Sequence, residues 1–160
     1  MKNAIMLHGT DCTPDSYWFP NIKKYLERNG YQVWAPQLPD SATPDLRKQL
    51  KYVIENGNFN EETIIIGHSA GGPLLLSVLE NIKKRIHKAI LVAGYARPKG
   101  DNPKPEPILQ EVYNWKKIKK NVKNIYFINS DNDPWGCDDK EGLYMFENIG
   151  GTLIIRHGEG

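Results

Sequence analysis

Residues 67–71, Gly67-His68-Ser69-Ala70-Gly71, form a Gly-x-Ser-x-Gly motif. The residues before it, 63–66, are a short β-branched run, and the apolar stretch 73–79 after it is typical of a helix. Strand, sharp turn and helix in this order are the setting in which the motif lifts a serine hydroxyl off the end of a strand. The alternative interpretation is a plain Gly/Ser turn before a buried helix.

The glycines of the motif have a steric reason. A serine in such a turn has strained backbone, and a Cβ on the residues two positions away is expected to clash, which Gly67 and Gly71 avoid. A helix that starts at Ala70 directs its free N–H groups and positive dipole end at Ser69. Negative charge on a substrate oxygen would be stabilised there.

Short apolar runs alternate with helical stretches along the rest of the chain. Repeated strand–helix units predict a mostly parallel sheet with helices on both faces, a three-layer α/β fold. We expect residues 1–160 to form one such domain with six strands. Thr43 is the expected N-cap of the second helix. The expected strands are 4–7, 31–35, 63–66, 88–93, 124–128 and 152–155, and the expected helices are 17–29, 44–55, 70–84 and 140–148.

Composition excludes several protein classes. The net charge of +2 is too small to indicate a nucleic-acid or membrane-surface partner. The N-terminus has no signal-peptide pattern, and no apolar run reaches membrane-spanning length. The two cysteines, Cys12 and Cys137, lack C-x-x-C spacing, so we expect reduced thiols in a cytoplasmic protein. The Pro/Lys-rich segment 95–107 is either a small flap over the site or a surface connection.

Chemically suggestive residues gather where strands end. In parallel sheets, sites form at the carboxyl ends of the strands. Ser69, then an acidic loop at 129–135, then His157 follow the Ser, Asp, His order of a hydrolase triad on this kind of sheet. We favour Asp133 as the acid because Pro134 fixes how the loop leaves it, and keep Asp131 as the second choice. The residues expected at this edge are His8, Ser69, Tyr95, Asp131, Asp133 and His157.

The loop after the first strand is the expected second half of the oxyanion site. The amides of Thr10 and Ala70 are the candidate donors, with Gly9 next, and His8 is expected to be structural. His68 should turn away from the serine. No metal-ligand or dinucleotide-binding spacing is present, so we expect neither metal nor cofactor. The candidate walls of an acyl pocket are Trp18, Phe19, Tyr95 and Trp135.

Several motifs together resemble one family, the small α/β-hydrolases related to retinoblastoma-binding protein nine. The matching stretches are Leu7-His8-Gly9, Tyr17-Trp18-Phe19-Pro20, the run 34–39, residues 67–72 and the loop 130–134. The resemblance covers essentially the whole chain. It implies a compact serine hydrolase without a large cap, esterase activity on small acyl substrates, and an acid at Asp133.

The C-terminal residues depart from this resemblance. The family's catalytic histidine follows a glycine, and in that register it would come directly after Gly160, with a final helix beyond it. His157, three residues before that glycine, is the alternative base. We expect a serine esterase with Ser69, Asp133 and a histidine. The competing hypothesis is an inactive hydrolase scaffold that binds a protein partner.

Overall fold

All six strands form one parallel sheet in the order β2-β1-β3-β4-β5-β6. The computed structural model describes residues 1–100 and 104–160, so part of the predicted flap, 101–103, lies outside the described residues. The strands are β1 Asn3–Leu7, β2 Gln32–Trp34, β3 Ile64–His68, β4 Ile86–Val92, β5 Val122–Ser130 and β6 Thr152–Arg156. The mostly parallel six-stranded sheet predicted from the sequence is confirmed.

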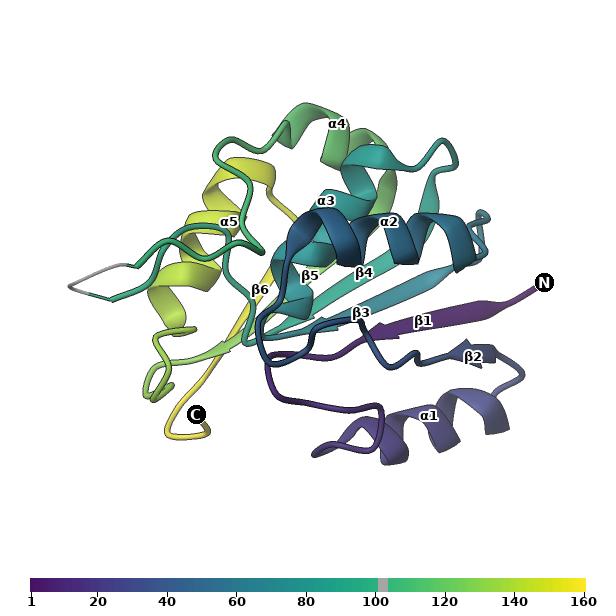
Figure 1. Cartoon of the computed structure of the whole chain (residues 1–160), viewed down its shortest axis with the longest axis horizontal. Helices are drawn as coiled ribbons and strands as arrows, with labels where there is room; N and C mark the ends of the chain where they lie inside the picture. The colour runs from purple at the N-terminus through teal and green to yellow at the C-terminus, as the bar shows by residue number, and fades with distance from the viewer. Residues whose placement is uncertain (101–103) are drawn as a thin grey trace.

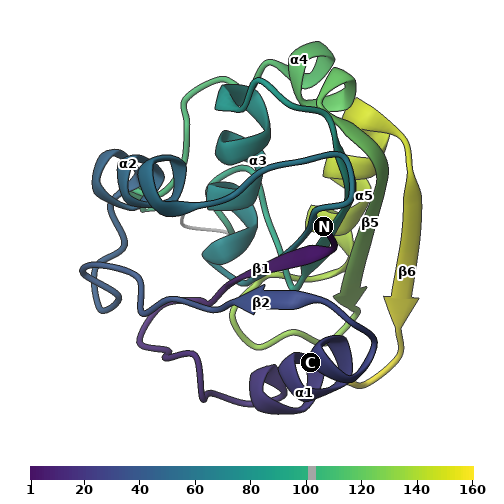
Figure 2. The ribbon, with the colours of Figure 1, turned by 90° about the vertical axis from the view of Figure 1, so that its right-hand side faces the viewer.

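Helices cover the two faces unequally (Figures 1 and 2). Four of them pack in a row on one face: α2 Leu46–Asn56, α3 Gly71–Asn81, α4 Trp115–Lys120 and α5 Asp139–Ile149. On the opposite face the described chain has one helix, α1 Phe19–Arg28. The three-layer arrangement is therefore present, with one thick and one thin helical layer.

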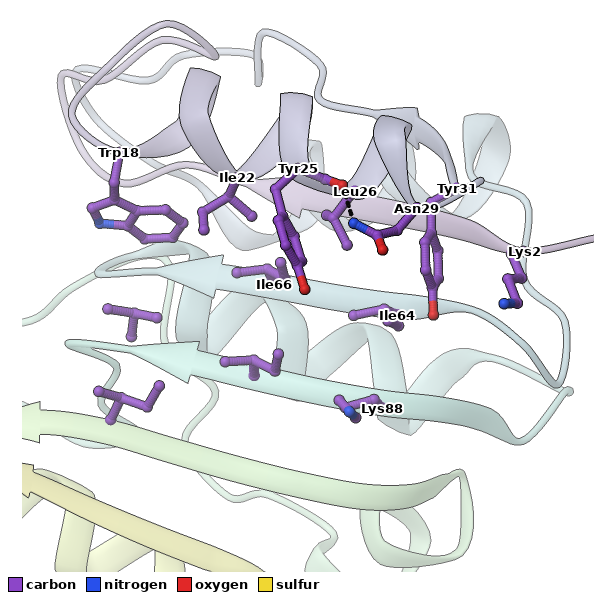
Figure 3. A pocket seen from close by; sticks show the side chains of 13 residues that line it. Lys2, Trp18, Ile22, Tyr25, Leu26, Asn29, Tyr31, Ile64, Ile66 and Lys88 are labelled. Atoms are coloured by element: carbon purple, nitrogen blue, oxygen red, sulfur yellow. Dashed lines mark hydrogen bonds between the residues drawn. The ribbon is translucent and has the colours of Figure 1, made fainter.

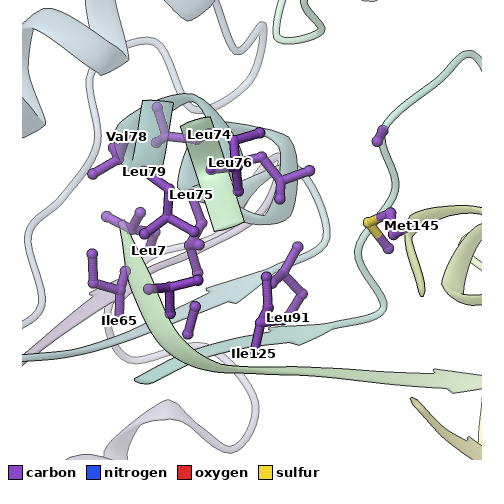
Figure 4. Close-up of a cluster of buried hydrophobic side chains, with 14 of the residues drawn as sticks. Leu7, Ile65, Leu74, Leu75, Leu76, Val78, Leu79, Leu91, Ile125 and Met145 are labelled. Atoms are coloured by element: carbon purple, nitrogen blue, oxygen red, sulfur yellow. The ribbon is translucent and has the colours of Figure 1, made fainter. Parts of the chain in front are cut away.

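The larger core lies between the sheet and α3. Every residue of α3 from Gly71 to Leu79 is buried, so this helix is apolar on all sides. Leu74, Leu75 and Leu79 meet Leu7, Ile65 and Leu91 of the central strands (Figure 4). The resulting core holds the start of α3 firmly against the ends of β1, β3 and β4, which is where Ser69 lies.

The thin layer leaves a groove beside α1 (Figure 3). The groove has a volume of about 730 Å³. One wall is α1 with Trp18 before it, and the floor is apolar, with Ile64 and Ile66 from β3 and Ile90 from β4. The side chains of Lys2 and Lys88 lie at one end of it.

Two local predictions were wrong. Thr43 does not cap the second helix: α2 begins at Leu46, and the carboxylate of Asp45 accepts the Lys48 N–H at 3.1 Å. The lysine-rich run 115–120, for which no helix was predicted, forms α4, capped by Asn114. Ile118 is its one fully buried side chain, so the apolar pattern of this short helix is too weak to read.

Candidate functional site

Ser69 lies in the sharp turn between β3 and α3. Its φ of 51° is a left-handed conformation that side chains rarely adopt. The turn is held at both ends, because the Ser69 N–H donates to the Val92 carbonyl at 3.0 Å and the Gly72 N–H donates to the Ser69 carbonyl at 2.8 Å. The predicted order of strand, sharp turn and helix is confirmed.

The glycines two residues from Ser69 are sterically required. A Cβ on Gly67 would lie 2.4 Å from the Gly71 carbonyl oxygen, and one on Gly71 would lie 2.2 Å from the Leu7 carbonyl oxygen. Real Cβ atoms do not approach backbone so closely. The predicted clash is therefore present at both positions, and the backbone of β1 is one of the surfaces that imposes it.

Ser69 opens into a pocket of about 680 Å³ at the carboxyl edge of the sheet. This volume suits a small organic ligand. The pocket brings together Ser69, Thr10 and Asp133, three of the residues expected to act together. Of the expected walls, Trp18, Tyr95 and Trp135 line it. Phe19 does not: it is buried in the smaller core beneath α1, which corrects its prediction as a wall.

The loop after β1 passes directly against the serine. A Cβ on Gly9 would lie 2.9 Å from the Ser69 Cβ and 3.4 Å from its Oγ, so only a glycine lets the loop come this near. Neither the Thr10 nor the Ala70 amide N–H has a hydrogen-bond acceptor among the described residues. Two donors near one hydroxyl suit the stabilisation of an oxyanion.

Buried His8 holds this loop in place, as expected for a structural residue. Its Nε2 accepts the Leu38 N–H at 3.0 Å, which leaves Nδ1 protonated to donate to the Gly9 carbonyl at 3.0 Å. Burial lowers the pKa of His8 below its ordinary value, with the Gly9 hydrogen bond opposing the shift. A neutral His8 therefore ties the Gly9–Thr10 turn to the segment after β2.

Strained backbone is concentrated at this pocket. Of the five described non-glycine residues with positive φ, four line it: Asp11, Tyr17, Ser69 and Ala93. Strain of this kind clusters at functional sites, where the surrounding structure maintains it. Only Ser69 was predicted from the sequence, since the others lack a motif that signals a left-handed conformation.

Asp133 is part of a tight turn at the pocket. Its Oδ1 accepts the N–H groups of Trp135 at 2.8 Å and Cys137 at 3.1 Å. The carboxylate therefore has a fixed place in the loop after β5. Gly160 packs on this loop, because a Cβ on it would lie 2.5 Å from the Asp133 nitrogen, and it also lines the pocket.

His157 lies elsewhere. Its side chain is 97% exposed, and its Nδ1 is 2.6 Å from Oδ2 of Asp131. The Asp131 carboxylate raises the pKa of His157. Neither residue lines the pocket, so the structure brings Ser69 and Asp133 to one cavity and pairs His157 with the second-choice acid outside it.

An ion pair that the sequence did not reveal closes another side of the pocket. Lys99 Nζ lies 2.6 Å from Glu106 Oε1 and 3.5 Å from the centre of the Tyr95 ring. The Tyr95 hydroxyl donates to Glu106 Oε2 at 2.6 Å, and burial raises the pKa of Tyr95 far above its ordinary value. This cluster joins the two ends of the segment after β4.

Both free thiols also line the pocket. Burial raises the pKa of Cys12, and raises that of Cys137 to about 12, so both stay protonated and poorly nucleophilic at neutral pH. Among the described residues, no three His, Cys, Asp or Glu side chains are grouped so as to hold a metal ion. Neither thiol is therefore activated as a nucleophile in this pocket.

The chain resembles known hydrolases in sequence and structure. Residues 4–160 match the family described as Serine hydrolase. Over 120 residues, 74% of this chain, it is 31% identical to Serine hydrolase RBBP9 of Rattus norvegicus. Over 135 residues, 82% of this chain, it is 27% identical to YdeN of Bacillus subtilis. These matches span 63% and 71% of the two relatives, so the rat protein is matched over less than two thirds of its length.

Solved structures show the same fold. The crystal structure of the Bacillus subtilis ydeN product superimposes with a TM-score of 0.90 at 24% identity, over 100% of this chain and 87% of that one. Est1E of Butyrivibrio proteoclasticus, solved with ferulic acid bound, gives a TM-score of 0.74 at 13% identity, over 99% and 80%. The sheet and its helices thus have the α/β-hydrolase architecture. Among the described residues, no helix is both long enough and apolar enough to span a bilayer.

Proposed function

Because this chain belongs to the serine hydrolase family, we propose that it cleaves small carboxylic esters through an acyl-enzyme on Ser69. The observation that carries the proposal is the position of Ser69, in a strained turn that opens into a cavity shared with Asp133 and the Gly9–Thr10 loop. A serine needs a cavity for its acyl group, an anion-stabilising site and a base, and this edge of the sheet supports the first two.

The reaction follows from these parts. Ser69 Oγ attacks the ester carbonyl carbon while a histidine removes its proton. The carbonyl oxygen becomes an anion and accepts hydrogen bonds from the amides of Thr10 and Ala70, aided by the dipole of α3. The histidine then protonates the departing alcohol. Water hydrolyses the acyl-enzyme by the same steps and releases the acid.

His157 is poorly placed to act as the catalytic base, because its ring is exposed and paired with Asp131. We propose instead that the catalytic histidine enters the pocket beside Gly160, which packs on the Asp133 turn. The resemblance described above expects a histidine directly after Gly160. Asp133 would then orient that histidine and stabilise its charged form.

A fluorophosphonate probe tests the nucleophile in the full-length protein. We expect one label on Ser69, no label on Ser69→Ala, and a fall of at least about 10³-fold in the turnover of p-nitrophenyl butyrate. Ser41→Ala is the matched control, since Ser41 lies outside the pocket, and it should label normally. Labelling that persists in Ser69→Ala would exclude Ser69 as the nucleophile.

A second substitution tests the base. His157→Ala should leave kcat/KM within about twofold, because a side chain outside the pocket stabilises no transition state there. A loss as large as that of Ser69→Ala would instead make His157 the base. Esters are the proposed substrates; a thioester or peptide hydrolysed faster than every ester would contradict that part.

A further inference from the structure

Two large aromatic side chains at the pocket are exposed. Tyr17 is 76% exposed and Trp135 is 80% exposed, and both line the pocket that contains Ser69. They come from different segments, the β1–α1 connection and the loop after β5. Aromatic side chains at the mouth of a cavity offer apolar surface on which a ligand can pack.

Tyr17 is held there against its backbone preference. A φ of 54° is unusual for a bulky residue, and the exposed ring regains little through burial. The turn nevertheless sets the Tyr17 ring edge-on to His68, with 5.7 Å between ring centres. Trp18 meets the same imidazole at 5.5 Å. Since His68 precedes the serine, aromatic surface continues from the pocket rim to the neighbour of Ser69.

Trp135 is fixed relative to the predicted acid. Its N–H donates to Asp133 Oδ1, and Gly136 closes the same turn with a φ of 75°. The turn that orients the carboxylate therefore also presents the indole. Neither ring is needed to fill the core, because both remain largely exposed.

We propose that this aromatic rim, Tyr17 and Trp135, selects esters that carry an aromatic ring, by stacking on that ring while the ester group reaches Ser69. The proposal rests on the proposed function and names its substrate class. Flat aromatic surfaces gain from offset or edge-on contact with another ring beyond the area they bury, whereas a saturated ring of the same size does not. The pocket volume of about 680 Å³ holds such a molecule.

The experiment measures binding apart from turnover. NMR titration of the Ser69→Ala protein gives Kd values for two matched pairs: methyl phenylacetate against methyl cyclohexylacetate, and benzyl acetate against cyclohexylmethyl acetate. The pairs place the ring on the acyl and on the alcohol side. We expect the aromatic member of at least one pair to bind about three- to tenfold more tightly. With active protein, the same pair should differ in KM more than in kcat.

Variants assign the preference to the rim. Trp135→Leu and Tyr17→Leu should each reduce the ratio of Kd values towards one, and Trp135→Phe should retain most of it. Tyr25→Leu is the matched control: Tyr25 is an exposed tyrosine outside this pocket and should leave the ratio unchanged. Far-UV circular dichroism checks that each variant is folded.

The experiment distinguishes failure of the aromatic-rim proposal from failure of the proposed esterase function. Equal Kd values within both pairs, or a preference that survives both leucine variants, overturns the rim proposal even if esters are hydrolysed. A preference that the rim variants remove supports it even if no ester is hydrolysed, and the absence of turnover then counts against the proposed function alone.

Discussion

The pocket at Ser69 and the groove beside α1 are nearly equal in size, about 680 and 730 Å³, and Trp18 lines both. Their construction differs. The groove has a floor of regular strands with apolar side chains, and its charged residues are Lys2 and Lys88. The pocket is made mainly of loops with left-handed backbone, carboxylates, thiols and the serine.

Volume alone therefore does not identify the reactive cavity. The groove results from side chains on a sheet face that one described helix covers in part, and parallel sheets are normally covered on both faces. The pocket lies where the backbone of the serine turn comes close to neighbouring segments, at Gly71 and Gly9. We expect substitutions that add atoms at the pocket edge to destabilise the protein strongly, and substitutions that remove atoms from the groove to destabilise it little.

The largest effect is expected at Gly71. Gly71→Ala places a methyl group 2.2 Å from the Leu7 carbonyl oxygen, so the turn and β1 must separate. We expect a loss of at least about 3 kcal/mol in the free energy of unfolding, measured with urea. Gly30→Ala is the control: a Cβ there meets nothing within 4 Å, and the positive φ of Gly30, which Gly71 does not share, should alone cost about 1 kcal/mol. Equal costs would mean that crowding at the turn is unimportant.

A smaller effect distinguishes the groove from the core. Ile65 is fully buried beneath α3, and Ile90 lines the groove. Ile65→Ala should cost about 3–4 kcal/mol, because it leaves a cavity in a closely packed core. Ile90→Ala should cost about 1 kcal/mol, since its side chain already has free space on one side. If urea denaturation gave equal losses, the groove would be packed as tightly as the core.

The part of the site that could be predicted from the sequence is the local part. The spacing of Gly67, Ser69 and Gly71 predicts the turn, and the steric conflict at Gly67 lies within the motif itself, whereas Gly71 conflicts with Leu7 of β1. The loop that holds Gly9 and Thr10 was expected at the oxyanion site from its place after the first strand. Alternating strands and helices predict a parallel sheet. Such a sheet brings the loops that follow its strands to one edge, even when they come from distant segments.

What could not be predicted depends on how loops fold and on which way side chains face. The Lys99–Glu106 pair and the partner of His157 depend on how loops fold back, and no motif indicates this. Phe19 is an aromatic residue of the kind that lines pockets, but it faces the core beneath α1. Its position along the helix decides which side of α1 it lies on. The left-handed conformation of Tyr17 is likewise imposed by its surroundings and not by its residue type.

Acid should weaken the pocket edge through His8. The pKa of His8 is lowered in the folded protein, so on acidification the unfolded chain takes up its proton first, near its ordinary pKa of 6.5. The stability that neutral His8 contributes is complete above that pH and is lost as the pH falls through the lower pKa of the folded state. The midpoint of urea denaturation should therefore decrease as the pH is lowered from 7.5 to 5.5.

His8→Gln isolates this effect. The glutamine side-chain oxygen can accept the Leu38 N–H as Nε2 does, but it gains no proton in this range. The variant should be less stable than the parent at pH 7.5, because the Gly9 contact is lost, and its urea midpoint should fall less on acidification. Some slope should remain, since burial also lowers the pKa of His68, next to Ser69. An unchanged slope would show that the histidine beneath the Gly9 loop is not what makes this edge sensitive to acid.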